Sequence, residues 1–279
     1  MFAHEFMRNA FLAGTFVALA CGLVGYFVVL RAQVFAGDAL SHVAFTGALA
    51  AAAAGIDPRI GLFAITIVVA VGMGAAGDRA RADDTVIGSF FAWILGLGAL
   101  FLSIFITSSS SSGNGTAAVR VLFGSILGLS ASEARLAALL AALAAVAVVA
   151  MARPLLFSSV DVEVAEARGV RVRAIGLAFL GVLGLVAAEA TQAVGALLLL
   201  GLLSAPGGAA HRLTANPYAG LALSASFALV AMWGGLVLSY LVPSLPPSSM
   251  IVMLAVAIYV VATAAGVRKA RNPKLESVS

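Results

Sequence analysis

Long apolar runs follow one another through almost the whole chain, and they restrict its possible folds more than any other feature. Nine runs approach the length of about 20 apolar residues that a membrane-spanning helix needs. They lie at 10–30, 38–54, 60–76, 86–107, 133–152, 174–188, 193–210, 218–241 and 250–267. Charged residues make up only 10% of the chain, against about 25% in soluble domains. The sequence therefore predicts an all-α, polytopic integral membrane protein with about nine transmembrane helices.

A single transmembrane domain is expected over residues 1–279, because no stretch has the composition of a separate soluble domain. Within it we predict a cytoplasmic loop at about 153–173 and a flexible C-terminal tail at about 268–279. The apolar stretch 117–131 is short and Gly-rich, so a re-entrant or interfacial segment is the alternative to a further span. The Ser-rich run 107–116 predicts a polar external loop and indicates no chemistry.

Basic residues between the runs predict the orientation, since cytoplasmic loops are rich in Lys and Arg. With nine spans and a cytoplasmic C-terminus, the cytoplasmic side holds 12 of the 16 basic residues and the external side holds three; Arg135 falls in a helix. This split predicts an external N-terminus. Because topology explains the positive charge, no nucleic-acid partner is expected.

The sharpest chemical signal is the segment 37–42, Gly-Asp-Ala-Leu-Ser-His, at the start of the second run. Asp38 and His42 are four residues apart, so a helix places them on one face. Ionisable groups inside a membrane are costly and usually mark an ion or substrate path. A carboxylate with an imidazole suits zinc, manganese or ferrous iron. The alternative is that Asp38 caps the helix while His42 bonds to a neighbour.

A second signal lies in the predicted cytoplasmic loop. Its candidate residues for contact with a soluble partner are Asp161, Glu163, Glu166, Ala167, Arg168 and Gly169. Acids at the start, a base at the end and a terminal Gly are typical of a short helix. Held between two spans, such a helix is suited to docking. A solvated connector without a partner is the alternative.

A third signal is Pro206-Gly207-Gly208 inside the run 193–210. Proline removes a helical hydrogen bond, and a broken helix in a transporter often lines the pathway. A simple kink, or the end of a short helix, is the alternative. Glu189 and Gln192 are expected in a short external gap just before this run.

Several catalytic signatures are absent from the sequence. The single cysteine, Cys21, excludes a cysteine-based metal cluster. No Gly-rich phosphate loop with Lys, HExxH pair or nucleophile elbow occurs. Nothing in the sequence therefore indicates an enzyme.

Together, these regions resemble the permease subunit family of ABC importers for zinc, manganese and iron. The resemblance rests on Gly22-Leu23-Val24-Gly25, Val29-Leu30-Arg31, the segment 37–42 and Gly47, followed by 161–169 and 195–206 in the same order. The family often has Pro at the position of Thr46 and Pro-Ala-Ala at 206–208. These departures concern local helix geometry.

The resemblance implies a type II ABC importer permease in a prokaryotic plasma (inner) membrane. Two copies, or two different permeases, would enclose one central pathway. A cytoplasmic ABC ATPase would dock around 160–170, and an extracellular or periplasmic binding protein would deliver the metal. Asp38 and His42 would contact the transported zinc, manganese or iron, with no cofactor bound permanently. Because ATP would be hydrolysed on the partner, this chain itself would not be an enzyme.

Two other functions remain open from the sequence. One is a permease for a metal chelate such as a siderophore. The other is a stand-alone secondary transporter, which predicts an internal inverted repeat that the sequence does not show. The residues do not choose among the three metals, because a carboxylate and an imidazole suit all of them.

Overall fold

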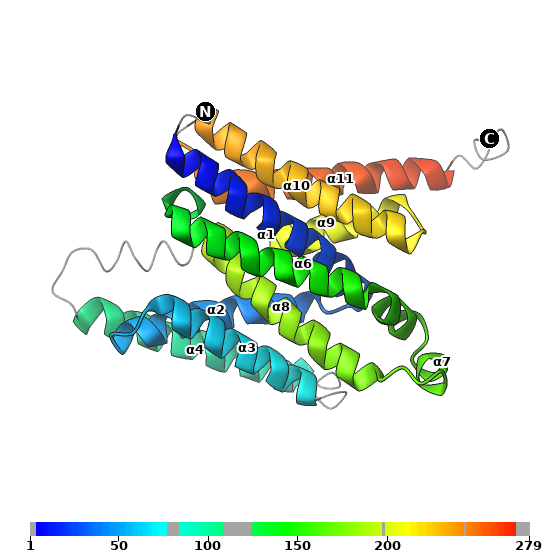
Figure 1. Ribbon diagram of the computed structural model, residues 1–279, viewed down its shortest axis with the longest axis horizontal. Coiled ribbons are helices and arrows are strands. Elements are labelled where there is room, and N and C mark those ends of the chain that lie inside the picture. The colour runs from blue at the N-terminus through cyan, green and yellow to red at the C-terminus, as the bar shows by residue number, and fades with distance from the viewer. Residues whose placement is uncertain (1–3, 77–83, 109–123, 197–198, 243, 272–279) are drawn as a thin grey trace.

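The computed structural model describes residues 4–76, 84–108, 124–196, 199–242 and 244–271 (Figure 1). Its helices are α1 (Glu5–Leu30), α2 (Val34–Ala53), α3 (Pro58–Ala76), α4 (Asp84–Ser108), η2 (Ile126–Gly128), α6 (Ala131–Val160), α7 (Val162–Ala167), α8 (Val172–Val194), α9 (Leu199–Leu213), α10 (Pro217–Leu241) and α11 (Pro247–Arg271). No strand occurs in the part of the chain that the structure describes. The predicted all-α class is confirmed.

Eight helices in these ranges are long and apolar enough to cross a membrane: α1 to α4, α6, α8, α10 and α11. The remaining predicted run, 193–210, is divided between the end of α8 and α9. Helix α9 has 15 residues, or about 22 Å at the α-helical rise, which is short of a bilayer core. Helix α9 nevertheless continues the alternating direction of the long helices, since α8 and α10 both run in the direction opposite to α9 (Figure 1).

The two ends of the bundle differ in their elements and their charge. Figure 1 places α7 and the end of α11 at one end, here called the α7 end, and the N-terminus at the opposite end. Of the nine basic residues with described side chains, six lie at or near the α7 end: Arg31, Arg153, Arg168, Arg171, Arg173 and Arg212. Arg8, Arg59 and Arg135 lie at the opposite end. By the same charge rule, the α7 end is predicted to be cytoplasmic.

Helix α1 lies at the centre and packs against α6, α8, α9 and α10. Its small residues at Ala10, Gly14, Ala18 and Gly22 are all buried. A Cβ at Gly22 would lie 2.6 Å from the Ala225 Cα, and one at Gly14 would lie 3.0 Å from the Met232 Sδ. The stripe therefore serves close packing of α1 on α10, as small residues do between helices in lipid.

Several predicted boundaries move. The predicted loop 153–173 is reduced to 161–171, because α6 continues to Val160 and α8 begins at Val172. Helix α11 extends to Arg271, into the predicted tail. Residues 109–116 of the Ser-rich run and 117–123 of the next stretch lie outside the described residues. The remainder, 124–130, does not span: it forms a 3-10 turn whose Ser125 N–H donates to the Gln192 carbonyl.

Candidate functional site

Asp38 lies inside α2 rather than at its start. The helix begins at Val34, four residues earlier than predicted, and its N-cap residue is Gln33. The capping interpretation of Asp38 is therefore wrong. Helix α2 packs against α3, α4 and α8, and both Asp38 and His42 are half-buried on it. An acid and an imidazole one turn apart thus face a partly open side of a helix that is otherwise mostly buried.

Neighbouring groups hold this pair in position. The Ser41 hydroxyl is buried and donates to the Asp38 backbone carbonyl at 2.7 Å. The His42 ring meets the Phe91 ring of α4 edge to face, with centroids 5.1 Å apart. Asp38 and His42 are also close enough to interact electrostatically. The imidazole therefore has an aromatic ring in contact with it and a carboxylate within electrostatic range.

Two ligands do not complete a metal site. No group of three or more His, Cys, Asp or Glu residues that could hold a metal occurs in the described ranges. Transition metals in proteins usually take four or more ligands. A metal at Asp38 and His42 would therefore need further ligands beyond the His, Cys, Asp and Glu residues of the described ranges, such as water or groups of another chain.

Thr46 belongs to the same helix and marks one departure from the family pattern. Its hydroxyl donates to the Ile94 carbonyl of α4 at 3.2 Å. A Cβ at Gly98 of α4 would lie only 2.9 Å from the Thr46 Oγ1, so glycine allows this close approach. The hydroxyl, which proline lacks, therefore helps to hold α4 against the helix that carries the pair.

The predicted short helix in the loop is confirmed as α7. The Asp161 carboxylate accepts from the Val164 N–H at 2.9 Å, so it caps the helix. Glu163 lies in the first turn, Arg168 is the C-cap, and Gly169 follows at φ +81°. Asp161 also ends α6, so one residue joins the two helices. This one-residue connection limits the directions in which α7 can project from α6.

The surface of α7 is open and partly apolar. Only Ala165 is buried in this helix, whereas Asp161, Glu163, Glu166, Ala167, Arg168 and Gly169 are all exposed. Val160 is 82% exposed, and Val162 and Val164 are 49% and 43% exposed. A shallow hollow lies beside them, lined by Glu166 and the segments 170–174 and Leu177. Exposed valines next to charged residues are typical of a surface that a protein partner covers.

The predicted break at 206–208 is wrong in its position. Helix α9 continues through Pro206 to Leu213. The helical structure is interrupted earlier, at Gly195, which ends α8 with a φ of +97°. Gly207 abuts the Gly25 backbone of α1, and Gly208 abuts the Tyr259 ring. The two glycines therefore allow close helix packing, and a pathway role for 206–208 remains a prediction.

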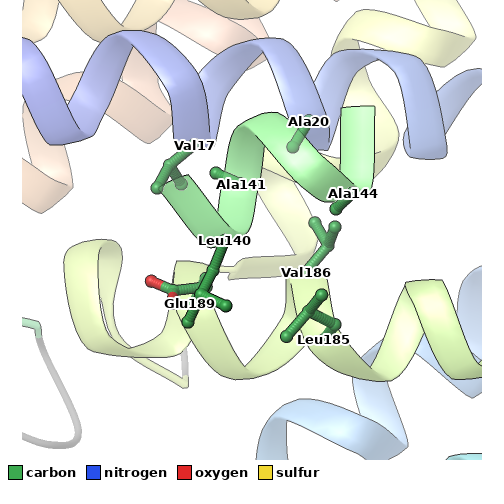
Figure 2. Close-up of a pocket in the computed structure, with 8 residues that line it drawn as sticks. All are labelled: Val17, Ala20, Leu140, Ala141, Ala144, Leu185, Val186 and Glu189. Carbon is green, nitrogen blue, oxygen red and sulfur yellow. The ribbon is translucent and has the colours of Figure 1, made fainter. Parts of the chain in front are cut away.

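Glu189 is an ionisable group that the sequence placed in an external gap. Helix α8 continues to Val194, so Glu189 and Gln192 lie within it, and Glu189 is 3% exposed. Figure 2 shows it beside Val17 of α1 and Leu140 of α6, at a cavity too narrow for water. No hydrogen bond reaches its Oε2 in the part of the chain described. In the sequence, the only sign of this buried acid was that Glu189 is a lone acid within an apolar stretch.

The end opposite α7 carries an ion pair. Arg59 in the first turn of α3 pairs with Glu133 in the first turn of α6. Glu133 also completes a capping box: its carboxylate accepts from the Ser130 N–H at 2.6 Å, and the Ser130 Oγ accepts from the Glu133 N–H. One acid thus stabilises the start of α6 and links it to α3.

The chain is similar in sequence and in structure to known membrane transport proteins. A manganese transport system membrane protein, MntC of Halalkalibacterium halodurans, is 28% identical over 240 residues, covering 86% of this chain and 80% of that protein. A Haemophilus influenzae protein named "Probable iron transport system membrane protein" is 28% identical, with 93% of both chains covered. The solved structure of PsaBC from Streptococcus pneumoniae in complex with Fab matches with a TM-score of 0.80 and 26% identity, covering 93% of this chain and 91% of that one.

The long apolar helices and the exposed helix between two of them define a multi-pass membrane permease. The family model described as "ABC 3 transport family" matches residues 3–266. The chain belongs to this ABC 3 transport family, and the predicted family resemblance is confirmed. A solved structure described as "An inward-facing conformation of a putative metal-chelate type ABC transporter", 18% identical with a TM-score of 0.63, shares the fold.

Proposed function

We propose that this chain is the membrane permease of an ATP-driven importer of divalent transition metal ions. The observation that carries the proposal is the Asp38–His42 pair on the half-buried face of α2. The relatives of this chain include transport proteins named for manganese and for iron. The metal is the cargo, so a site with few ligands per chain suits it, because transport requires capture that is readily reversed.

Two copies of the chain would complete the coordination. A carboxylate oxygen and an imidazole nitrogen from each copy supply four ligands, a set that zinc, manganese and ferrous iron accept. The edge-to-face contact with the Phe91 ring would restrict the orientation of the His42 imidazole. The half-buried state of both side chains leaves them accessible to a second copy.

The energy would come from a separate ATPase subunit that docks on α7. Its capped start, exposed valines and neighbouring hollow form a surface suited to a protein partner. The six arginines at the α7 end support a cytoplasmic location for it. A binding protein on the opposite side would deliver the metal to the pathway.

Reconstitution tests the proposal. The chain is purified with its ATPase and binding protein, placed in lipid vesicles, and assayed for uptake of Mn²⁺, Zn²⁺ and Fe²⁺. We expect uptake only with ATP, and its loss in Asp38→Asn and His42→Ala with assembly unchanged. Asp57→Asn is the matched control, because Asp57 is exposed and Asn still caps α3. Uptake without the ATPase, or uptake of a metal chelate alone, would contradict the proposal.

A further inference from the structure

Arg31 lies where the α7 connection and the start of α2 come together. It is the C-cap residue of α1, and only Ala32 and Gln33 separate it from α2. The turn is tight: the Gln33 N–H donates to the Val28 carbonyl at 2.8 Å, and Ala32 has a φ of +53°. Asp38 follows within about two helical turns. A displacement of Arg31 is therefore transmitted to the helix that carries the acid–imidazole pair.

The Arg31 side chain contacts both helices that flank α7. Its Nη1 is 3.4 Å from the Oγ atoms of Ser158 and Ser159, in the last turn of α6. Both serine hydroxyls donate to the Leu155 carbonyl, so their lone pairs remain to accept from the guanidinium. The guanidinium also lies over the Phe179 ring of α8, 5.7 Å from its centroid. One side chain thus joins α1, α6 and α8.

The connection between α6 and α7 is short. Ser159 is two residues from Asp161, which both ends α6 and caps α7. On the other side of the contact, Phe179 is fully buried and packs edge to face on Phe27 of α1, with centroids 6.1 Å apart. Movement of α7 can therefore reach Arg31 by two routes: through Asp161 and the last turn of α6, and through residues 168–171 and Phe179 of α8.

We propose that Arg31 is a positioning residue that transmits movement of α7 to α2, and so couples ATP hydrolysis to metal movement at Asp38 and His42. This inference rests on the proposed function. The described contacts link α7 to Arg31 in few steps. Coupling requires that the ATPase at α7 and the metal at Asp38 and His42 both bias the position of one element, which here is α2. Lysine is a poor replacement, because its ammonium lacks the planar guanidinium that lies over the Phe179 ring while Nη1 contacts the two hydroxyls.

The test compares variants of the complete transporter in vesicles, with metal uptake and ATP hydrolysis measured together. Arg31→Gln should assemble and hydrolyse ATP, while uptake per ATP falls by about 2- to 30-fold, the range seen for residues that modulate coupling. Arg31→Lys and the double variant Ser158→Ala/Ser159→Ala should give smaller falls. Arg212→Gln is the control, an exposed arginine at the same end of the bundle. Its ratio should equal that of the wild type.

An unchanged ratio of uptake to hydrolysis in Arg31→Gln overturns the proposal. If that variant does not assemble, the double serine variant decides in the same way: a lowered ratio supports the link and an unchanged ratio overturns it. A second measurement is independent of the cargo. Hydrogen exchange at the backbone amides of 34–41 should change when the ATPase binds nucleotide, and this change should be lost in Arg31→Gln. If the wild type moves no metal, the proposed function fails, while the exchange result still tests the link.

Discussion

The Ser224 hydroxyl of α10 donates a 2.6 Å hydrogen bond to the Gly22 carbonyl of α1. This contact is possible only because the two helix backbones nearly touch. A Cβ at Gly22 would lie 2.6 Å from the Ala225 Cα and 2.7 Å from the Ser224 carbonyl oxygen. Backbone atoms cannot move aside as a side chain can, so Gly22→Ala must separate α1 from α10.

We expect Gly22→Ala to destabilise the protein by about 1–3 kcal/mol, the usual cost of overpacking. The measurement is thermal unfolding in detergent, followed by loss of the monodisperse species. Gly72→Ala in α3 is the matched control, because nothing lies within 4 Å of a Cβ there. Alanine is the better helix former, so the control should be as stable as the wild type or more stable. Equal midpoints for the two variants would contradict the packing argument.

The ion pair between Arg59 and Glu133 predicts a smaller effect. Both side chains are partly exposed, at 41% and 21%, so solvent screens their attraction and the pair contributes about 1 kcal/mol at most. Glu133→Gln removes the charge but keeps a side chain that completes the capping box. It should lower the unfolding midpoint slightly, and the difference from the wild type should vanish at high salt.

Glu133→Ala separates the two roles of this residue. Alanine removes the ion pair and the acceptor for the Ser130 N–H together, so the loss should exceed that of Glu133→Gln by about 0.5–1.5 kcal/mol. High salt should not remove this additional loss, because the capping bond is short and local. Equal stability of the two variants would show that the cap contributes nothing.

The helices were predictable from the sequence where apolar length and capping agree. Asp161 and Gly169 carry the propensities that begin and end a short helix, and α7 has those limits almost as predicted. The start of α2 was missed for a physical reason. Its two-residue turn needs Ala32 at φ +53°, a conformation that non-glycine residues adopt rarely and that local sequence does not indicate.

Two predicted interruptions of apolar helices were wrong. Glu189 interrupts an apolar run, and such an interruption usually marks a loop, but helix packing overrides it and buries the residue within α8. Proline usually marks a break, yet α9 continues through Pro206 to Leu213. The burial of Glu189 depends on neighbouring helices that are distant in sequence. The Asp38–His42 pair was predictable because its spacing is local.

Glu189 offers a third prediction. Its Oε2 has no hydrogen bond in the described part of the chain, and the other residues that line the adjacent cavity are apolar. A charge there would be costly, so Glu189→Gln, which keeps the shape without the charge, should unfold at the wild-type temperature or higher. Glu189→Ala enlarges the adjacent gap and should cost about 2 kcal/mol or more.

Thermal unfolding in detergent checks this pair of variants, with Glu163→Gln as the control. Glu163 is exposed on α7, and its substitution should change stability by less than about 0.5 kcal/mol. A large loss in Glu189→Gln would mean that the carboxylate is charged and paired, contrary to the geometry described above.

The last prediction concerns the cap of α7. The Asp161 carboxylate accepts from the Val164 N–H, and asparagine can do the same while alanine cannot. Loss of such a cap costs about 1 kcal/mol, and α7 has only six residues, so Asp161→Ala should leave it frayed. If α7 docks the ATPase subunit, Asp161→Ala should weaken binding of that subunit by about fivefold. Asp161→Asn should bind within twofold of the wild type. The affinity is measured with the purified ATPase and the permease in lipid nanodiscs. Equal weakening by both variants would show that the charge of Asp161, and not its cap, makes the contact.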